Sequence, residues 1–369
     1  MVKRVLLFAL ICVALFGTGQ SRANVLDSVK FKSDVPIGVT VGKNFELTLT
    51  GYGQVHYEYT KEDGAESTNT FEVKRVILIG GVRVGKHLRG SVMVDVANNN
   101  ANRRLQEYYL QWDVVPEFKL RVGQYKQPFM LENVYSPTTL GAVSITEGTR
   151  YMSGIGGDVL QGNMAGRDLG IMATGEAFKL NDGHRLLEYS LGVFNGSGVN
   201  MRDNNSTKDV IGMLKLRPVK PLMLTTSFII GRGHALADSP YGDIVAGENY
   251  RRQRWSAGLE FKYGPLMLRS EYTRGRNGDI KSRAFYAEAW LRLYKGLELV
   301  ANYDFLDRNT ALSREEQELF PTYTETGNYT IGLQYWVWKR CRVASQYVYS
   351  DRTTGPDRHQ WITQFQLAF

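Results

Sequence analysis

Two pairs of basic residues stand two positions apart in segments where apolar and polar residues alternate. Lys215 and Arg217 form the first pair, and Arg252 and Arg254 form the second. Residues at i and i+2 project from the same face of an extended strand, so each pair places two cations side by side. The arginine guanidinium is a planar fork of N–H donors that matches phosphate and carboxylate oxygens. The pattern therefore predicts binding of anions along the face of a strand.

Strands of this kind recur along most of the chain and must position these cations. From Phe45 to Phe369, apolar residues alternate with polar ones in segment after segment, as in 45–59 and 285–293. This period places the apolar residues on one face of each strand and the polar residues on the other. The connections alternate between long polar loops and tight turns such as the one at 264–265. An even number of strands, about sixteen, with this rhythm is typical of outer-membrane barrels.

A soluble β-sandwich or a β-helix would also alternate, but each fits the chain less well. A sandwich rarely needs so many strands and does not sort its loops into long and short ones. A β-helix would show a fixed sequence repeat, and none is found. In lipid every backbone polar group must pair internally, so strands can span a membrane only as a closed barrel. We therefore predict an all-β fold over residues 45–369, a transmembrane antiparallel β-barrel of about sixteen strands.

The two ends of the sequence indicate the compartment. A basic start, an apolar run and small residues before Asn24 predict a signal peptide over residues 1–23. Residues 24–44 have no strong period and are expected to be an N-terminal periplasmic lead-in. Phe369 ends an alternating strand, which is the pattern of a membrane-insertion signal read by the barrel-insertion machinery. The predicted location is the cell outer membrane of a Gram-negative bacterium, with the barrel in contact with outer-membrane lipid.

Composition argues against several other classes of protein. Lysine and arginine number 45, against 37 aspartate and glutamate residues. Removing the three basic residues of the signal leaves 42 against 37, a net charge of +5. This mild excess, without a compact basic cluster, predicts no nucleic-acid partner. We also expect no catalytic residues, no metal site and no cofactor. The alternative of an enzyme at the barrel rim would depend on His234 with Asp238 or Asp243.

Several stretches resemble the phosphate-selective porin O/P family, in the form common in Bacteroidota. They include LRVGQYKQPFMLEN at 120–133, GRDLG at 166–170, LGVFNGSG at 191–198 and KLRP at 215–218. The resemblance covers nearly the whole mature chain. It implies a sixteen-stranded porin that assembles as a homotrimer, with the loop after the fifth strand folded into the lumen as a constriction.

The loop after the fifth predicted strand has an unusual length. Roughly forty residues follow that strand without a sustained period, and loops of this length are usually functional or disordered. Scattered apolar residues such as Phe129 and Met152 favour packing against the inside of the barrel. The candidate constriction charges are Glu132, Glu147, Arg150, Arg167 and Asp168. For Arg167 and Asp168 the alternative is a structural pair that anchors the return of the loop.

Strand parity predicts which cations line the lumen and bind anions. These pore-lining candidates are Arg121, Lys215, Arg217, Arg252, Arg254, Arg269 and Arg292. Acidic residues such as Glu260, Glu271 and Glu288 fall on the same faces, which is also the pattern of a general diffusion porin. We predict a passive channel for small hydrophilic solutes with some preference for anions, phosphate among them. The alternative is a barrel whose long extracellular loops act mainly as an adhesin or receptor surface.

Overall fold

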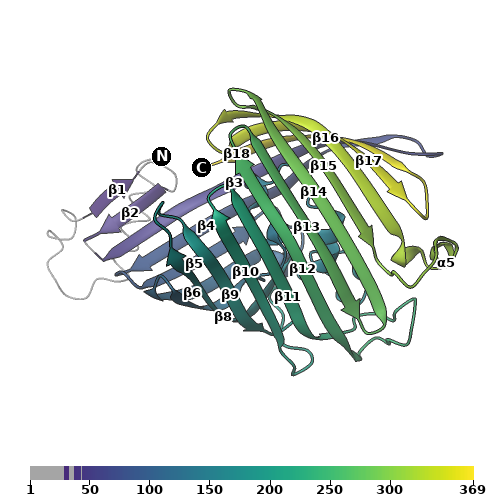
Figure 1. The fold of residues 1–369 in the computed structure, drawn as a ribbon, viewed down its shortest axis with the longest axis horizontal. Coiled ribbons are helices and arrows are strands. Elements are labelled where there is room, and N and C mark those ends of the chain that lie inside the picture. Colours follow the sequence, from purple (N-terminus) through teal and green to yellow (C-terminus); the bar gives the residue numbers. More distant parts are fainter. Residues whose placement is uncertain (1–28, 33–36, 43) are drawn as a thin grey trace.

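The chain folds into a closed antiparallel barrel (Figure 1). The computed structural model describes residues 29–32, 37–42 and 44–369, and the predicted signal peptide lies outside these ranges. Within the described residues eighteen strands form one sheet, and the last sixteen close on themselves where β18 (Arg358–Ala368) pairs with β3 (Phe45–Glu62). The predicted all-β barrel of about sixteen strands is confirmed.

Each barrel strand pairs with the strands before and after it in the chain, as in an up-and-down barrel. The remaining barrel strands are β4 (Thr68–Val84), β5 (Leu88–Asp95), β6 (Leu105–Val115), β7 (Phe118–Lys126), β8 (Arg167–Lys179), β9 (Arg185–Phe194), β10 (Asp209–Val219), β11 (Leu222–His234), β12 (Asn249–Tyr263), β13 (Leu266–Asn277), β14 (Ile280–Tyr294), β15 (Leu297–Asp307), β16 (Glu325–Trp338) and β17 (Cys341–Arg352).

The connections sort by length between the two ends of the barrel. One end, the short-turn end, carries tight connections such as 116–117, 264–265 and 295–296. The other, the long-loop end, carries 127–166, 195–208, 235–248 and 308–324, the last of which contains α5 (Arg314–Leu319). One connection at the long-loop end, Gly278-Asp279, has only two residues, because Gly278 adopts a positive φ of 57° that permits a tight hairpin.

The wall of the barrel is apolar outside and polar inside. Alternate residues such as Leu110 and Trp112 are 60% and 52% exposed, while Gln54 and Gln364 on the opposite face are buried. A transmembrane barrel shows this arrangement because its outer face contacts lipid and its inner face contacts water. Within the described residues, no helix is long and apolar enough to cross a membrane.

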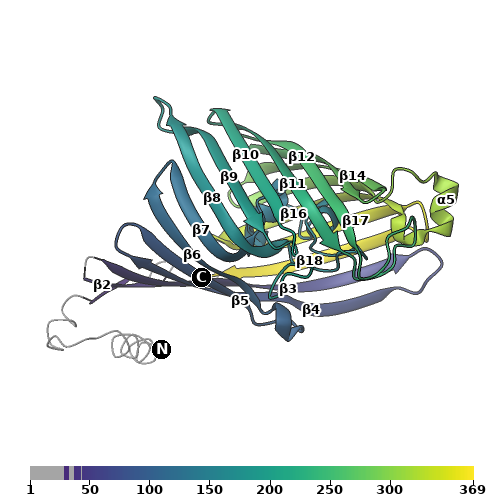
Figure 2. The ribbon, with the colours of Figure 1, turned by 90° about the horizontal axis from the view of Figure 1, so that it is seen from below.

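A short hairpin extends the sheet beyond the wall at the short-turn end (Figure 1), where Figure 2 labels its second strand. It consists of β1 (Val29–Lys32) and β2 (Ile37–Val41), and β2 pairs with the first residues of β3, from Phe45 to Leu49. The described part of the lead-in at 24–44 therefore pairs as strands, although its sequence shows no strong period. Backbone pairing with β3 explains this, since it does not depend on side-chain alternation.

The C-terminal residue completes the seam between the last strand and β3. Phe369 N donates a hydrogen bond to the Gly51 carbonyl at 2.9 Å, and Gly51 N donates to the Phe369 carbonyl at 3.0 Å. A Cβ atom added at Gly51 would lie 2.8 Å from the Phe369 ring atom Cζ and would also clash with the Ile77 carbonyl. Glycine at position 51 therefore provides the space in which the terminal ring sits.

We expect Gly51→Ala to impair closure of the barrel, whereas Gly53→Ala serves as the matched control. The new methyl group at 51 must displace Phe369 or the β4 backbone, and overpacking of this kind costs roughly 1–3 kcal/mol. No atom lies within 4 Å of a Cβ added at Gly53, one step further along the same face of β3. The measurement is the fraction of refolded barrel on an unheated gel, together with its melting temperature. Equal values for the two variants would contradict the role assigned to Gly51.

Candidate functional site

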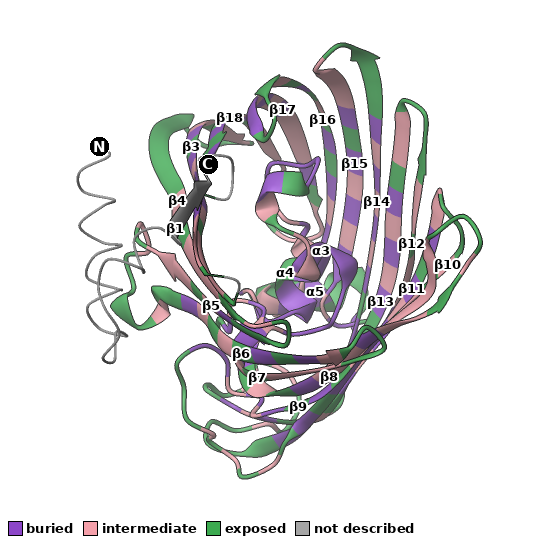
Figure 3. Cartoon of the chain, turned by 90° about the vertical axis from the view of Figure 1, so that its left-hand side faces the viewer, coloured by how far each residue is buried: buried purple, intermediate pink, exposed green. Residues whose placement is uncertain are grey.

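The connection between β7 and β8, here called the inner segment (residues 127–166), lies inside the ring of strands. Figure 3, a view along the barrel, shows its helices α3 (Leu131–Val134) and α4 (Glu147–Met152) within that ring. Phe129, Leu131 and Met152 are completely buried. The inner segment is therefore packed, and its main-chain groups need hydrogen-bond partners.

The first part of the inner segment is bound by side chains of β11, β12 and β13. Met130 N donates to Ser227 Oγ at 3.1 Å, and Leu131 N donates to both carboxylate oxygens of Glu271, at 2.9 and 3.2 Å. Tyr135 OH donates to Glu260 Oε2 at 2.9 Å. Two acidic residues of the inner face, Glu260 and Glu271, thus accept hydrogen bonds from the start of the inner segment.

The middle of the inner segment is bound by β14 and β17. Ala142 N donates to Glu288 Oε2 at 2.7 Å, and Arg342 donates to the Leu140 carbonyl at 2.6 Å. The Gln346 side chain donates to the Gly141 carbonyl at 2.7 Å and accepts a hydrogen bond from Val143 N at 2.8 Å. A Cβ added at Gly141 would overlap the indole of Trp290, so glycine lets the chain lie against that ring.

The last part of the inner segment is held by Arg254 of β12. Its guanidinium donates to the Met152 carbonyl and to Gln161 Oε1 at 2.7 Å, and it pairs with Asp158 at 3.3 Å. Asn277 Nδ2 donates to the same Asp158 carboxylate at 2.9 Å. Since Arg254 and Asp158 are both buried, their charges are neutralised by each other and by these hydrogen bonds.

Glu132 joins the two helices of the inner segment. Its carboxylate accepts hydrogen bonds from Thr146 N, at 3.2 Å, and from Thr146 Oγ1. Burial and, to a smaller extent, the nearby Glu288 raise the pKa of Glu132, the hydrogen bonds from Thr146 and Thr149 lower it, and together they place it at about 8. Glu132, predicted as a constriction charge, therefore accepts its hydrogen bonds from the inner segment itself.

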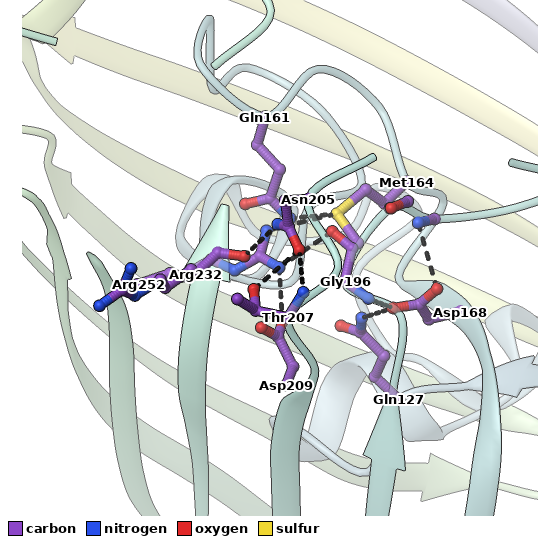
Figure 4. Close-up of polar contacts among 12 residues, drawn as sticks. Gln127, Gln161, Met164, Asp168, Gly196, Asn205, Thr207, Asp209, Arg232 and Arg252 are labelled. Carbon is purple, nitrogen blue, oxygen red and sulfur yellow. Dashed lines mark hydrogen bonds and ion pairs between the residues drawn. The ribbon is translucent and has the colours of Figure 1, made fainter. Parts of the chain in front are cut away.

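Arg252 is also enclosed, in the network drawn in Figure 4. Its side chain is 2% exposed, pairs with Asp209 at 2.5 Å and donates to the Gly196 carbonyl at 3.0 Å. Asp168, which is fully buried, accepts from Gly196 N at 2.5 Å and Gly198 N at 3.2 Å. These contacts hold the β9–β10 loop against the return of the inner segment.

The two neighbours Arg167 and Asp168 do not pair with each other. Arg167 Nε donates to Glu107 at 3.0 Å and its NH1 donates to the Ala165 carbonyl at 2.9 Å. Asp168 binds the glycines at 196 and 198 instead. Arg167 and Asp168 therefore bind different partners close to the point where the inner segment enters β8.

Most of the other predicted cations also have carboxylate partners. Arg269, buried on β13, pairs with Glu260 at 3.0 Å and with Glu288 at 3.6 Å. The remaining pairs are Arg217 with Glu188, Arg292 with Glu298 at 3.8 Å, and Arg150 with Glu147 at 3.4 Å. Arg121 and Lys215 are the two pore-lining candidates that form no ion pair with a carboxylate of the described residues.

Arg121 and Lys215 line a hollow of about 510 Å³, here called the first hollow. It is bounded by β3 to β10 and by the inner segment between Pro128 and Pro137, and Arg340 from the β16–β17 turn also lines it. Arg121 donates to Gln111 Oε1 at 2.6 and 2.9 Å and lies over the Tyr109 ring at 4.2 Å, contacts that fix its position without neutralising it.

Every carboxylate that lines the first hollow is already paired. Glu107 pairs with Arg167, Glu176 with Lys119 at 3.4 Å, and Glu188 with Arg217. Within the described part of the chain, Arg121, Lys126, Lys215 and Arg340 have no such partner, so the wall carries excess positive charge. Lys126 is bound to the inner segment, because its Nζ donates to the Tyr135 carbonyl at 2.5 Å. Sequence reasoning missed Arg340, because a turn residue has no strand parity from which its direction could be read.

The residues considered for chemistry at the barrel rim, His234 and Asp238, have separate hydrogen-bond partners. His234 Nδ1 contacts Asn249 Oδ1 at 3.0 Å, while Asp238 accepts from Ala246 N at 2.8 Å. In the residues that the structure describes, no group of three His, Cys, Asp or Glu side chains could hold a metal ion.

The fold is a closed sixteen-strand antiparallel barrel that is similar to the barrels of solved porins. An anion-selective porin from Comamonas acidovorans matches with a TM-score of 0.65 and 14% identity over 88% of this chain and 100% of its own. The outer membrane channel DcaP of Acinetobacter baumannii gives a TM-score of 0.60 and 12% identity over 88% and 98% of the two chains. The trimer form of OmpT, an outer membrane protein of Vibrio cholerae, gives 0.60 and 13% over 88% and 99%.

These similarities establish the fold and no closer relationship. No protein-family model matches the sequence, and no curated protein sequence matches it.

Proposed function

We propose that the protein is a passive channel of a Gram-negative outer membrane, through which small hydrophilic solutes diffuse with a preference for anions. The observation that carries this proposal is the unpaired positive charge of Arg121, Lys215 and Arg340 on the wall of the first hollow. A charged wall in a lumen of low-dielectric surroundings raises the local concentration of the opposite ion. The inner segment narrows the lumen, so permeating ions pass close to these side chains.

The structural neighbours support this proposal at two points. One is described as an anion-selective porin and another as an outer membrane channel. A third is described in a trimer form, which supports a homotrimer with one lumen in each protomer. Phosphate is a candidate solute because guanidinium and ammonium groups both bind its oxygens well.

The test is conductance of the refolded protein in planar lipid bilayers. Under a gradient of potassium chloride we expect a reversal potential that favours chloride, because the unpaired charges of the first hollow are positive. A trimer should close in three equal conductance steps. Absence of conductance would contradict the channel and favour loops that act as a binding surface. A reversal potential that favours potassium would contradict the anion preference.

A further inference from the structure

A second hollow of about 820 Å³ lies on the other side of the inner segment. It is bounded by strands β12 to β17, and its lining includes Gly264, Pro265, Lys295 and Gly296 of the tight turns, so it lies at the short-turn end. Residues Ser136 and Pro137 line the first hollow, whereas Tyr135 and Leu140 line the second. This short stretch of the segment therefore divides the two.

The wall of the second hollow is unusual for a water-filled lumen because much of it is apolar and aromatic. Leu140, Leu266 and Met267 line it together with the rings of Tyr135 and Trp336. Both rings are held in place. Trp336 Nε1 donates to Glu298 at 2.9 Å, and the Arg269 guanidinium lies 4.2 Å from the centre of the Tyr135 ring. Fixed rings of this kind favour stacking with another flat ring.

The charge around this wall is positive and incompletely paired. Glu260 is paired with Arg269 at 3.0 Å, and Glu298 accepts from Gln334 Nε2 at 2.7 Å as well as from Trp336. Lys262 and Lys295, both exposed, line the hollow and form no ion pair with a carboxylate of the described residues. The second hollow thus combines apolar surface with ammonium groups that can receive a carboxylate.

We propose that the second hollow binds an aromatic carboxylate, with its ring against Trp336 and its carboxylate directed to Lys262 and Lys295. The volume lies in the usual range for small-molecule sites, roughly 300–1,000 Å³. Phosphate suits this hollow less well, because an apolar wall cannot replace the water that a small multiply charged ion loses. The proposal rests on the channel function, since the solute reaches this hollow through the lumen, and it names a class of solute for it.

The test is calorimetric titration of the refolded protein in detergent with benzoate, with titrations into protein-free micelles subtracted. We expect benzoate to bind at least tenfold more tightly than acetate, which lacks the ring, and than benzyl alcohol, which lacks the charge. This readout does not require conductance, so a failure of binding and a failure of the channel function can be told apart.

Two variants and one control assign the binding to this hollow. Lys262→Gln combined with Lys295→Gln should weaken benzoate binding at least tenfold, and these exposed positions should not disturb folding. Trp336→Leu should bring benzoate down to the affinity of acetate. Lys339→Gln, at a neighbouring turn outside the hollow's lining, should change nothing. Benzoate affinity equal to that of acetate, or unaltered in the double lysine variant, would overturn the proposal.

Discussion

Replacement of Arg121, Lys215 and Arg340 together by glutamine is expected to lower the chloride-to-potassium permeability ratio about tenfold. A unit charge about 7 Å from an ion contributes roughly 0.6 kcal/mol at the dielectric constant of water. Three such charges attract chloride and repel potassium, so after partial screening at about 0.1 M salt the difference between the two ions is roughly 1–2 kcal/mol, and 1.4 kcal/mol corresponds to a factor of about ten. The reversal potential under a potassium chloride gradient measures this change directly.

The control for this variant removes the same charge from other places. Lys86, Lys179 and Lys281 are exposed and are not among the residues that line either hollow. Their joint replacement by glutamine should leave the reversal potential nearly unchanged. An equal shift in both triple variants would show that net charge, and not the wall of the first hollow, determines the preference.

The second large effect is expected at the buried ion pair that holds the end of the inner segment. Asp158→Asn keeps the shape of the side chain but leaves Arg254, whose side chain is 1% exposed, without its counter-charge. Removing one partner of a buried pair typically costs 3–5 kcal/mol. Arg254 would retain its hydrogen bonds to Gln161 and Met152. We therefore expect a loss of roughly 2–4 kcal/mol in the free energy of unfolding, measured by urea titration in lipid vesicles.

An exposed ion pair of the same chemistry provides the comparison. Arg276 pairs with Asp279 at 2.9 Å, and their side chains are 43% and 86% exposed. Asp279→Asn should cost less than about 1 kcal/mol, because water solvates the arginine that remains. Since the segment could detach while the wall stays closed, single-channel current noise is recorded as well, and Asp158→Asn should increase it. Equal stability and equal noise in the two variants would refute the anchoring role of the Arg254–Asp158 pair.

The contacts of Arg252 and Arg254 on β12 differ from the anion binding that their spacing predicts. Arg252 and Arg254 share one face of a strand, as their spacing requires. Each is buried in an ion pair, Arg252 with Asp209 of β10 and Arg254 with Asp158 of the inner segment. Successive arginines on one face can therefore act as anchors for a loop inside a barrel. The unpaired cations that line the first hollow come from β7, β10 and a turn between β16 and β17.

Strand alternation is a local property, and it was sufficient to predict the barrel. Lipid on one side and water on the other impose a period of two on every strand, which any short window of sequence displays. The limits of strands were harder to predict. The Gly-rich run that begins at Gly231 reads as a loop, yet β11 continues to His234. Gly231 and Gly233 lie against Asp209 and Tyr250 of neighbouring strands, where a Cβ would clash. Glycine there permits close cross-strand packing, a requirement visible only in the paired structure.

The amino-acid sequence by itself determined the class of fold, the inward direction of the strand cations and the unusual length of the inner segment. Only the tertiary structure decided which of these cations have a carboxylate partner and which have none. Arg254 meets Asp158 across 96 positions of sequence, and Arg342 meets Leu140 across 202. Parity fixes the face from which a side chain projects, but the charge that neutralises it comes from a segment whose path depends on packing, such as Gly141 against Trp290. Long-range pairing therefore separates Arg121, Lys215 and Arg340 from the arginines that anchor the inner segment.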